Sequence, residues 1–96
     1  MDKEIIKKII EFRDKRDFKK HHKGEHLAKA LIIEASELLE CFQWQNEVND
    51  VNHLKEELAD VFIYAVLLAE KYDFDIKEII LNKLEKNKIK YPVNNS

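Results

Sequence analysis

Two pairs of acidic residues lie within segments whose other residues are mostly apolar. Segment 27–42 reads LAKALIIEASELLECF and segment 54–68 reads LKEELADVFIYAVLL, each with the spacing of a helix. The acidic residues are Glu34, Glu37, Glu57 and Asp60. Because residues three apart project from the same side of a helix, each pair points toward the face that packing should bury. Unpaired carboxylates are costly there, and a hard divalent cation with oxygen ligands would offset that cost.

The alternative is that these carboxylates decorate a solvated face. A single pair of glutamates at this spacing usually has no other meaning, but two pairs on adjacent helices, both in apolar columns, favour a metal site. Other acidic residues lie off the apolar columns, so that ordinary surface charge is expected for them. These residues are Glu40, Glu47, Glu56, Glu70 and Glu78.

Length and composition limit the class of protein. A chain of 96 residues with one Gly, one Pro and 38% charged residues predicts a single, nearly all-α domain with a thin core. The net charge of -2 argues against a nucleic-acid binder. The lone Cys41 cannot form an internal disulfide and suits a reducing cytoplasm. Neither a secretory signal nor an apolar run long enough to span a membrane is recognised.

The elements that must position the carboxylates are four predicted helices. They are expected at about 2–19, 25–45, 53–72 and 76–91, within one domain of residues 1–92 followed by a disordered tail at 93–96. Asp50 or Asn52 is expected to cap the third helix, and Asp75 opens a capping box with Glu78 in the fourth. The second and third helices should pack antiparallel across the short polar segment 46–52.

The second helix is apolar on nearly all sides, which is typical of a helix that is covered on most faces. A chain this short cannot cover it alone, so the pattern predicts a four-helix bundle completed by homo-oligomerisation, as a dimer or a dimer of dimers. Ile32 and Ile33 lie away from the column of Glu34 and are expected to meet another subunit.

Other arrangements of reactive residues are weaker. His22 and His26 have a spacing that could hold zinc, but nothing completes such a site, and solvated histidines are the favoured interpretation. Neither acidic pair is followed by a histidine three residues on, which disfavours a ferritin-like di-iron centre. No glycine-rich phosphate loop is present. Trp44, at the end of the second helix, could stack on a flat ligand such as a base or belong to the core.

Three strings of the sequence resemble a known family. EASELLECFQW, EELADVFIYAVLLA and KLEKNKIKYP are similar to the MazG-like all-α nucleoside triphosphate pyrophosphohydrolases, with the dCTP pyrophosphatase type as the nearest branch. The resemblance extends from about Phe12 to Pro92. It implies that the magnesium ligands, for which manganese could substitute, are Glu34, Glu37, Glu57 and Asp60. It also implies that Glu34 or Glu37 is the general base, and leaves the choice open.

The same resemblance implies residues that bind the substrate. Trp44 and Tyr64 correspond to residues that line the nucleotide pocket. Phe18 and His22 lie in RDFKKHH, which matches a family stretch written RDWxQFH with two aromatic positions changed. The residues expected to hold the phosphates or close the site are Lys83, Asn87, Lys90 and Tyr91. The departures in RDFKKHH leave base and sugar selectivity open.

The expected function is magnesium-dependent hydrolysis of a (deoxy)nucleoside triphosphate, a pyrimidine one such as dCTP, to the monophosphate and pyrophosphate. Such a reaction would serve nucleotide pool sanitation in the cytoplasm, with no nucleic-acid or membrane partner. One alternative is a non-catalytic dimerising bundle whose acidic patch binds metal. Another is the same fold acting on a different phosphate substrate, such as a phosphoribosyl compound.

Overall fold

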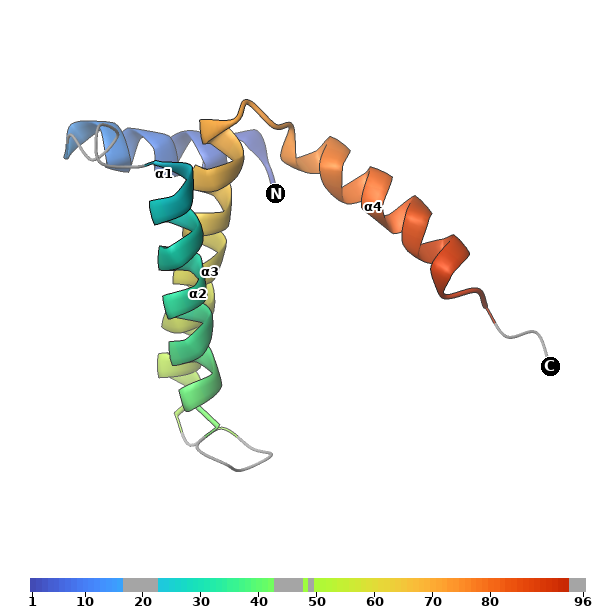
Figure 1. The fold of residues 1–96 in the computed structure, drawn as a ribbon. Helices are drawn as coiled ribbons and strands as arrows, with labels where there is room; N and C mark the ends of the chain where they lie inside the picture. The colour runs from blue at the N-terminus through green and yellow to red at the C-terminus, as the bar shows by residue number, and fades with distance from the viewer. Residues whose placement is uncertain (17–22, 43–47, 49, 94–96) are drawn as a thin grey trace.

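The computed structural model describes residues 1–16, 23–42, 48 and 50–93 (Figure 1). These residues form four α-helices and no strand, which confirms the predicted all-α class. The helices are α1 (Lys3–Lys15), α2 (Gly24–Glu40), α3 (Val51–Lys71) and α4 (Ile76–Lys90). None of them is long and apolar enough to cross a membrane.

Aspartate side chains cap three of the four helices. The Asp2 carboxylate accepts a hydrogen bond from the Ile5 amide at 2.8 Å, and the Asp75 carboxylate accepts one from the Glu78 amide at 3.0 Å. Asp50 accepts from two amides of the first turn of α3, including that of His53 at 3.2 Å. Each carboxylate satisfies amides that have no partner within the helix. The predicted cap Asp75 is therefore confirmed, and of the two candidates for α3, Asp50 or Asn52, it is Asp50 that caps the helix.

Two helices end earlier than predicted. The second was expected to reach residue 45, but α2 ends at Glu40, and the amides of Cys41 and Phe42 donate to carbonyls three residues back, at 3.2 and 3.1 Å. This tightening is typical of a final helical turn. The first helix was expected to reach residue 19, but α1 ends at Lys15. Residues 17–22, 43–47, 49 and 94–96, including most of the predicted tail, lie outside the described part.

The turn between α3 and α4 sets the direction of the last helix. Asp73 adopts a left-handed backbone conformation with a φ of 56°. The Phe74 amide then donates to the Ala69 carbonyl at 2.9 Å, and the Asp73 amide donates to the Glu70 carbonyl at 3.1 Å. These two hydrogen bonds form a Schellman motif, which ends α3 and satisfies its last carbonyls. Beyond it, α4 extends away from the other helices (Figure 1).

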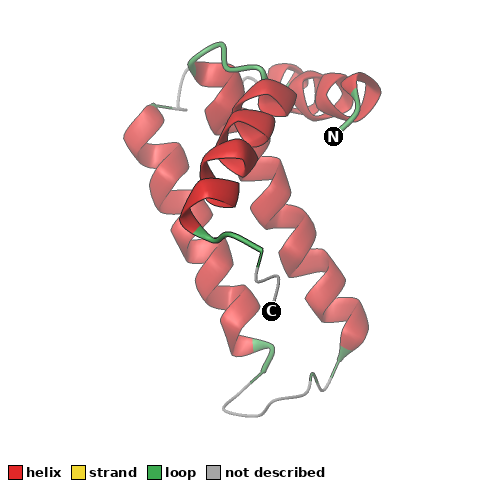
Figure 2. Ribbon diagram, turned by 90° about the vertical axis from the view of Figure 1, so that its right-hand side faces the viewer, coloured by secondary structure: helices red, strands yellow, loops and turns green. Residues whose placement is uncertain are grey.

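The centre of the molecule is the antiparallel pair of α2 and α3, which pack side by side (Figures 1 and 2). This pairing is as predicted. The core between the helices is small, as expected for a short chain. Its buried apolar residues are Leu27, Cys41, Val66, Leu67 and Ala69.

Helix α1 crosses α3 near the C-terminal end of α3, and a buried arginine of α1 holds it there. The side chain of Arg13 is 5% exposed and forms ion pairs with Glu70 of α3 and with its neighbour Asp14. Burial works against the charged guanidinium, but the two carboxylates outweigh it and raise the pKa of Arg13. The prediction that Glu70 is ordinary surface charge is therefore wrong, because the helix that supplies its partner crosses α3 from elsewhere in the chain.

Much apolar surface stays uncovered within one chain. On α2, Ile32 is 70% exposed and Ile33 is also exposed. On α4, every side chain except those of Ile76 and Asn87 is exposed. Within the described residues, α1, α2 and α3 pack together and α4 lies outside them, so the predicted four-helix bundle is not formed within one chain.

Candidate metal centre

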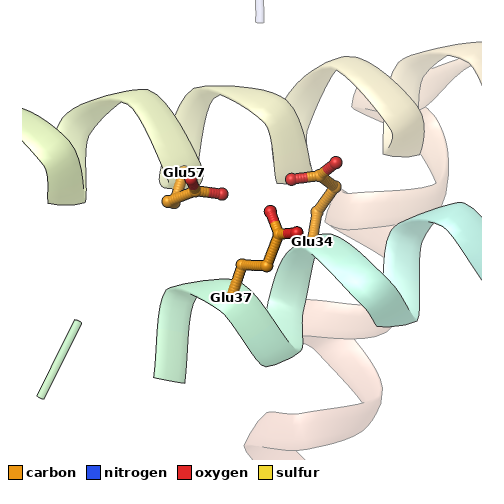
Figure 3. Close-up of side chains that lie close together, drawn as sticks. All are labelled: Glu34, Glu37 and Glu57. Atoms are coloured by element: carbon orange, nitrogen blue, oxygen red, sulfur yellow. The ribbon is translucent and has the colours of Figure 1, made fainter. Parts of the chain in front are cut away.

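Three of the four predicted carboxylates meet between α2 and α3. Glu34 and Glu37 come from α2 and Glu57 comes from α3, and each offers a carboxylate oxygen within 4.8 Å of the others (Figure 3). The spacing of three residues places the first pair on one side of α2. The antiparallel packing then places Glu57, one and a half turns into α3, against that side.

Two of the carboxylate oxygens in this cluster are buried without a partner. Oε2 of Glu34 and Oε2 of Glu57 accept no hydrogen bond from any residue that the structure describes. Buried polar atoms in folded proteins nearly always have a partner, and carboxylates gathered together also repel one another. A divalent cation would bind the unpartnered oxygens and would also neutralise the repulsion between the carboxylates. An all-carboxylate donor set is what a hard cation such as Mg²⁺ prefers. The residues present therefore fit a metal ion.

The electrostatics of the cluster point the same way. Burial, followed by the neighbouring Glu37, raises the pKa of Glu34 to about 7 from its ordinary 4.5, and the charge of Asp60 contributes further. Burial and Glu37 also raise the pKa of Glu57. Two acids on facing helices therefore hold protons more tightly than free carboxyls do, as expected when negative charges share a site without a counter-ion.

Asp60, the fourth predicted ligand, lies one turn further along α3 and does not join the cluster of close oxygens. It is half-buried and lines a cavity of about 760 Å³ between α1 and α3, together with Tyr64. Other walls of this cavity are apolar, among them Ile9 and Phe12 of α1. Its volume is within the range of small-molecule pockets. Tyr64, which was predicted to line the nucleotide pocket, thus lines a mostly apolar cavity that is also lined by the carboxylate of Asp60.

His53 was not identified from the sequence as a neighbour of the acidic cluster. It lies one helical turn before Glu57, and its Nε2 atom is 3.7 Å from Glu57 Oε1. The spacing of four residues on a predicted helix was the available signal. Nothing in the sequence distinguished this pair from other pairs of charged residues at the same spacing.

Four of the remaining predicted site residues are described, and none of the four belongs to the cluster of close oxygens. All four lie at the C-terminal end, on or directly after α4, which extends away from the pair of α2 and α3 (Figure 1). They are Lys83, Asn87, Lys90 and Tyr91. Phe18, His22 and Trp44 lie outside the described residues, so the zinc hypothesis for His22 and His26 is not tested either.

Residues 29–96 match the model of the MazG-like family. This chain belongs to the MazG-like family. The matched MazG-like region contains all four acidic residues and the whole of α4. The family predicted from the three sequence strings is therefore confirmed.

Curated relatives of this MazG-like chain include dCTP pyrophosphatase 1 of Mus musculus, 35% identical over 92 residues that cover 86% of this chain and 54% of the relative. The Homo sapiens protein of the same name is 35% identical over 91 residues, covering 85% and 54%. The chain thus spans about half the length of the curated relatives it matches.

A solved structure shares the fold over nearly the whole length of both chains. A pyrophosphatase from Archaeoglobus fulgidus superposes with a TM-score of 0.86 at 36% sequence identity, covering 94% of this chain and 91% of that chain. The four-helix arrangement described above is therefore an arrangement that this pyrophosphatase also adopts.

Proposed function

We propose that this protein is a divalent-cation-dependent nucleoside triphosphate pyrophosphohydrolase, with dCTP as the first candidate substrate. The observation that carries the proposal is the cluster of Glu34, Glu37 and Glu57, in which two buried oxygens have no partner among the described residues. The relatives support the same reaction class, since they are dCTP pyrophosphatases and a pyrophosphatase.

Glu34, Glu37 and Glu57 would hold the cation, and Asp60 would join them from the next turn of α3. Mg²⁺ is the expected ion, with Mn²⁺ as a substitute that accepts the same oxygen ligands. When bound, a divalent cation supplies positive charge against the triphosphate and makes water a better nucleophile.

The protein's own residues would divide the remaining work. Glu34 or Glu37 takes the proton of the attacking water. Attack at the α-phosphorus breaks the bond between the α-phosphorus and its bridging oxygen, releasing pyrophosphate and leaving the nucleoside monophosphate. Tyr64 and the apolar cavity beside Asp60 offer a place for the base or sugar. Phe18, His22 and Trp44 are proposed to complete that pocket.

Self-association is part of the proposal. Ile32 and Ile33 of α2 are exposed, and α4 exposes apolar side chains on several sides, including Ile80 and Leu84. Exposed apolar side chains in such number favour contact with other protein surfaces. A homodimer or a dimer of dimers would cover it. In such an assembly Lys83, Asn87, Lys90 and Tyr91 would bind phosphate groups at a neighbouring subunit's acidic cluster.

The cellular setting follows from the same reasoning. A nucleotide-sanitising enzyme acts where the triphosphate pool lies, so we place the protein in the cytoplasm, where Cys41 would stay reduced. A nucleoside triphosphate and other copies of this chain are then its proposed partners, and neither nucleic acid nor a membrane is required.

The test is pyrophosphate release from a panel of nucleoside and deoxynucleoside triphosphates, with Mg²⁺ and with EDTA. Wild-type protein should release pyrophosphate from at least one of them in Mg²⁺, and EDTA or Glu57→Gln should abolish the release. Glu56→Gln, an exposed neighbour that lies outside the cluster, is the matched control and should stay active. If no nucleotide is hydrolysed although the protein binds Mg²⁺, the non-catalytic metal-binding bundle is the correct account.

A further inference from the structure

Helix α1 is attached to the rest of the molecule through a charged residue. All residues of α1 are described, and Arg13 is the only one among them that is buried. None of its apolar side chains is buried to the same degree, and Phe12 is 52% exposed. The buried apolar residues of the core come from α2 and α3 and from Cys41, which directly follows α2. Apolar burial therefore holds α1 less firmly than it holds the central pair, and the position of α1 depends on what Arg13 contacts.

The guanidinium of Arg13 is oriented by its own helix and reaches across to α3. Its Nε and Nη2 atoms both lie against Oδ1 of Asp14, at 2.9 and 2.8 Å. This leaves Nη1 to donate to Oε2 of Glu70 on α3. Because the guanidinium is planar and three of its nitrogens are engaged, it cannot rotate without losing a partner. The ion pair thus fixes α1 against α3 at this point.

The same arginine lies in the wall of the cavity proposed for the base or sugar. This cavity of about 760 Å³ is lined from α1 by Phe12 and Arg13 and from α3 by Asp60 and Tyr64. Phe12 directly precedes Arg13, so a displacement of Arg13 moves the aromatic wall with it. The width of the cavity is therefore set by where the ion pair with Glu70 holds α1.

We propose that Arg13, through its ion pair with Glu70, is a positioning residue that holds α1 as one wall of the nucleotide cavity. The inference rests on the proposed function, which places the base or sugar in this cavity. Arg13 acts without touching the nucleotide, since two carboxylates already engage its guanidinium. The acidic cluster lies between α2 and α3, so loss of the pair should weaken nucleotide binding and leave ion binding unchanged.

The first test separates KM from kcat. Glu70→Gln keeps the shape of the side chain and removes its charge, and Arg13→Met removes the guanidinium. Both variants should raise KM for the nucleotide by about 10-fold, as expected when the contact with one apolar side chain is lost. Both should keep the wild-type kcat and the wild-type affinity for Mn²⁺, which is measured by electron paramagnetic resonance of the free ion. An increase of KM in Arg13→Met alone would mean that Arg13 contacts the nucleotide directly, and would overturn the proposal.

A loss of stability by itself should not reproduce this result. Leu27→Ala is the matched control, because Leu27 is buried in the core and does not line the cavity. It should lower the melting temperature and leave KM unchanged, and a KM raised as much as in Glu70→Gln would make the effect one of stability alone.

A double variant tests whether attachment of α1 is what matters. Arg13→Met combined with Glu70→Leu replaces the ion pair by apolar side chains, an exchange that often costs no stability. Because these side chains can also hold α1 against α3, KM should return toward the wild-type value. A KM as high as in the single variants would show that the charge of Arg13 is itself required, and would contradict a positioning role.

Hydrogen–deuterium exchange reports on α1 without any hydrolysis of nucleotide. In Glu70→Gln the amides of α1 should exchange about 10-fold faster, since a helix that is held less firmly opens more often. The amides of α2 should change less, because α2 makes no part of this ion pair. Wild-type exchange rates in α1 of Glu70→Gln overturn the proposal.

The two proposals can fail separately. Binding of α,β-imido-dCTP, which cannot be cleaved between the α- and β-phosphates, is measured by calorimetry in Mg²⁺. If wild-type protein binds this analogue but hydrolyses no nucleotide, and Glu70→Gln binds it more weakly, the positioning role stands and the enzymatic function does not. If hydrolysis occurs and Glu70→Gln has the wild-type KM, the function stands and the positioning role is wrong. A protein that neither binds the analogue nor hydrolyses a nucleotide overturns both.

Discussion

Replacing Glu34 by glutamine should make the metal-free protein more stable while removing the proposed metal-dependent activity. Burial, together with the neighbouring Glu37, raises the pKa of Glu34 to about 7 from 4.5. The folded state therefore binds this proton more tightly than the unfolded state does. The ionised form costs stability as a result: the cost is absent below about pH 4.5, grows between pH 4.5 and 7, and is complete above pH 7.

The size of the effect follows from the pKa difference. One pKa unit corresponds to about 1.4 kcal/mol, so a rise from 4.5 to about 7 sets an upper bound of about 3.5 kcal/mol for the cost of ionised Glu34. Glu34 keeps some contact with solvent, which screens the neighbouring charges, so we expect about 1–2 kcal/mol. Glutamine has nearly the shape of the protonated acid and can donate to the remaining carboxylates, so it should recover this amount at high pH.

The assay is urea denaturation in EDTA at fixed protein concentration, at pH 8 and at pH 4.5. Glu34→Gln should exceed the wild type in free energy of unfolding at pH 8 and converge with it at pH 4.5. Glu40→Gln, an exposed change on the same helix, should stay within about 0.5 kcal/mol of the wild type at both pH values. A wild type as stable as Glu34→Gln at pH 8, or a difference that ignores pH, would refute the reasoning.

Three further predictions concern the scaffold. Glu70→Ala leaves the buried Arg13 with Asp14 as its remaining ion-pair partner among the described residues. We expect the free energy of unfolding, measured by urea denaturation, to fall by about 2–3 kcal/mol, and a fall below about 1 kcal/mol would show that the pair is unimportant. Asp73→Gly relieves the left-handed backbone at the end of α3 and should add about 0.5–1 kcal/mol, seen as a higher melting temperature, whereas a lower one would contradict the Schellman assignment. The double change Ile32→Asp and Ile33→Lys should split the proposed oligomer and lower activity together, measured by light scattering and pyrophosphate release; a wild type that is monomeric and active at micromolar concentration would end that idea.

Features that depend on a few neighbouring residues could be predicted from the sequence. Asp50 and Asp75 cap their helices because a carboxylate two or three residues ahead of an amide needs no tertiary contact to reach it. The acidic pair of α2 was likewise predictable, since helical periodicity alone places Glu34 and Glu37 on the face that meets α3.

Contacts that depend on how the helices cross could not be predicted from the sequence. The Arg13–Glu70 ion pair joins α1 to α3 across 57 positions, and periodicity within α3 made Glu70 look exposed. Asp60 shares a face with Glu57, but the register of the antiparallel pair decides which of them reaches the α2 carboxylates. The separation of α4 from the other helices could not be predicted either, because the apolar residues of a helix do not say where that helix packs.

The central claim is that this chain cleaves a nucleoside triphosphate between the α- and β-phosphates with its carboxylate cluster and a divalent cation. The most direct measurement is ³¹P NMR of the reaction in ¹⁸O-labelled water with Mg²⁺ and a mixture of nucleoside and deoxynucleoside triphosphates. The account predicts that a nucleoside monophosphate appears with the label on its phosphorus while the pyrophosphate stays unlabelled. Label in inorganic phosphate beside a nucleoside diphosphate, or no product at all, would contradict it.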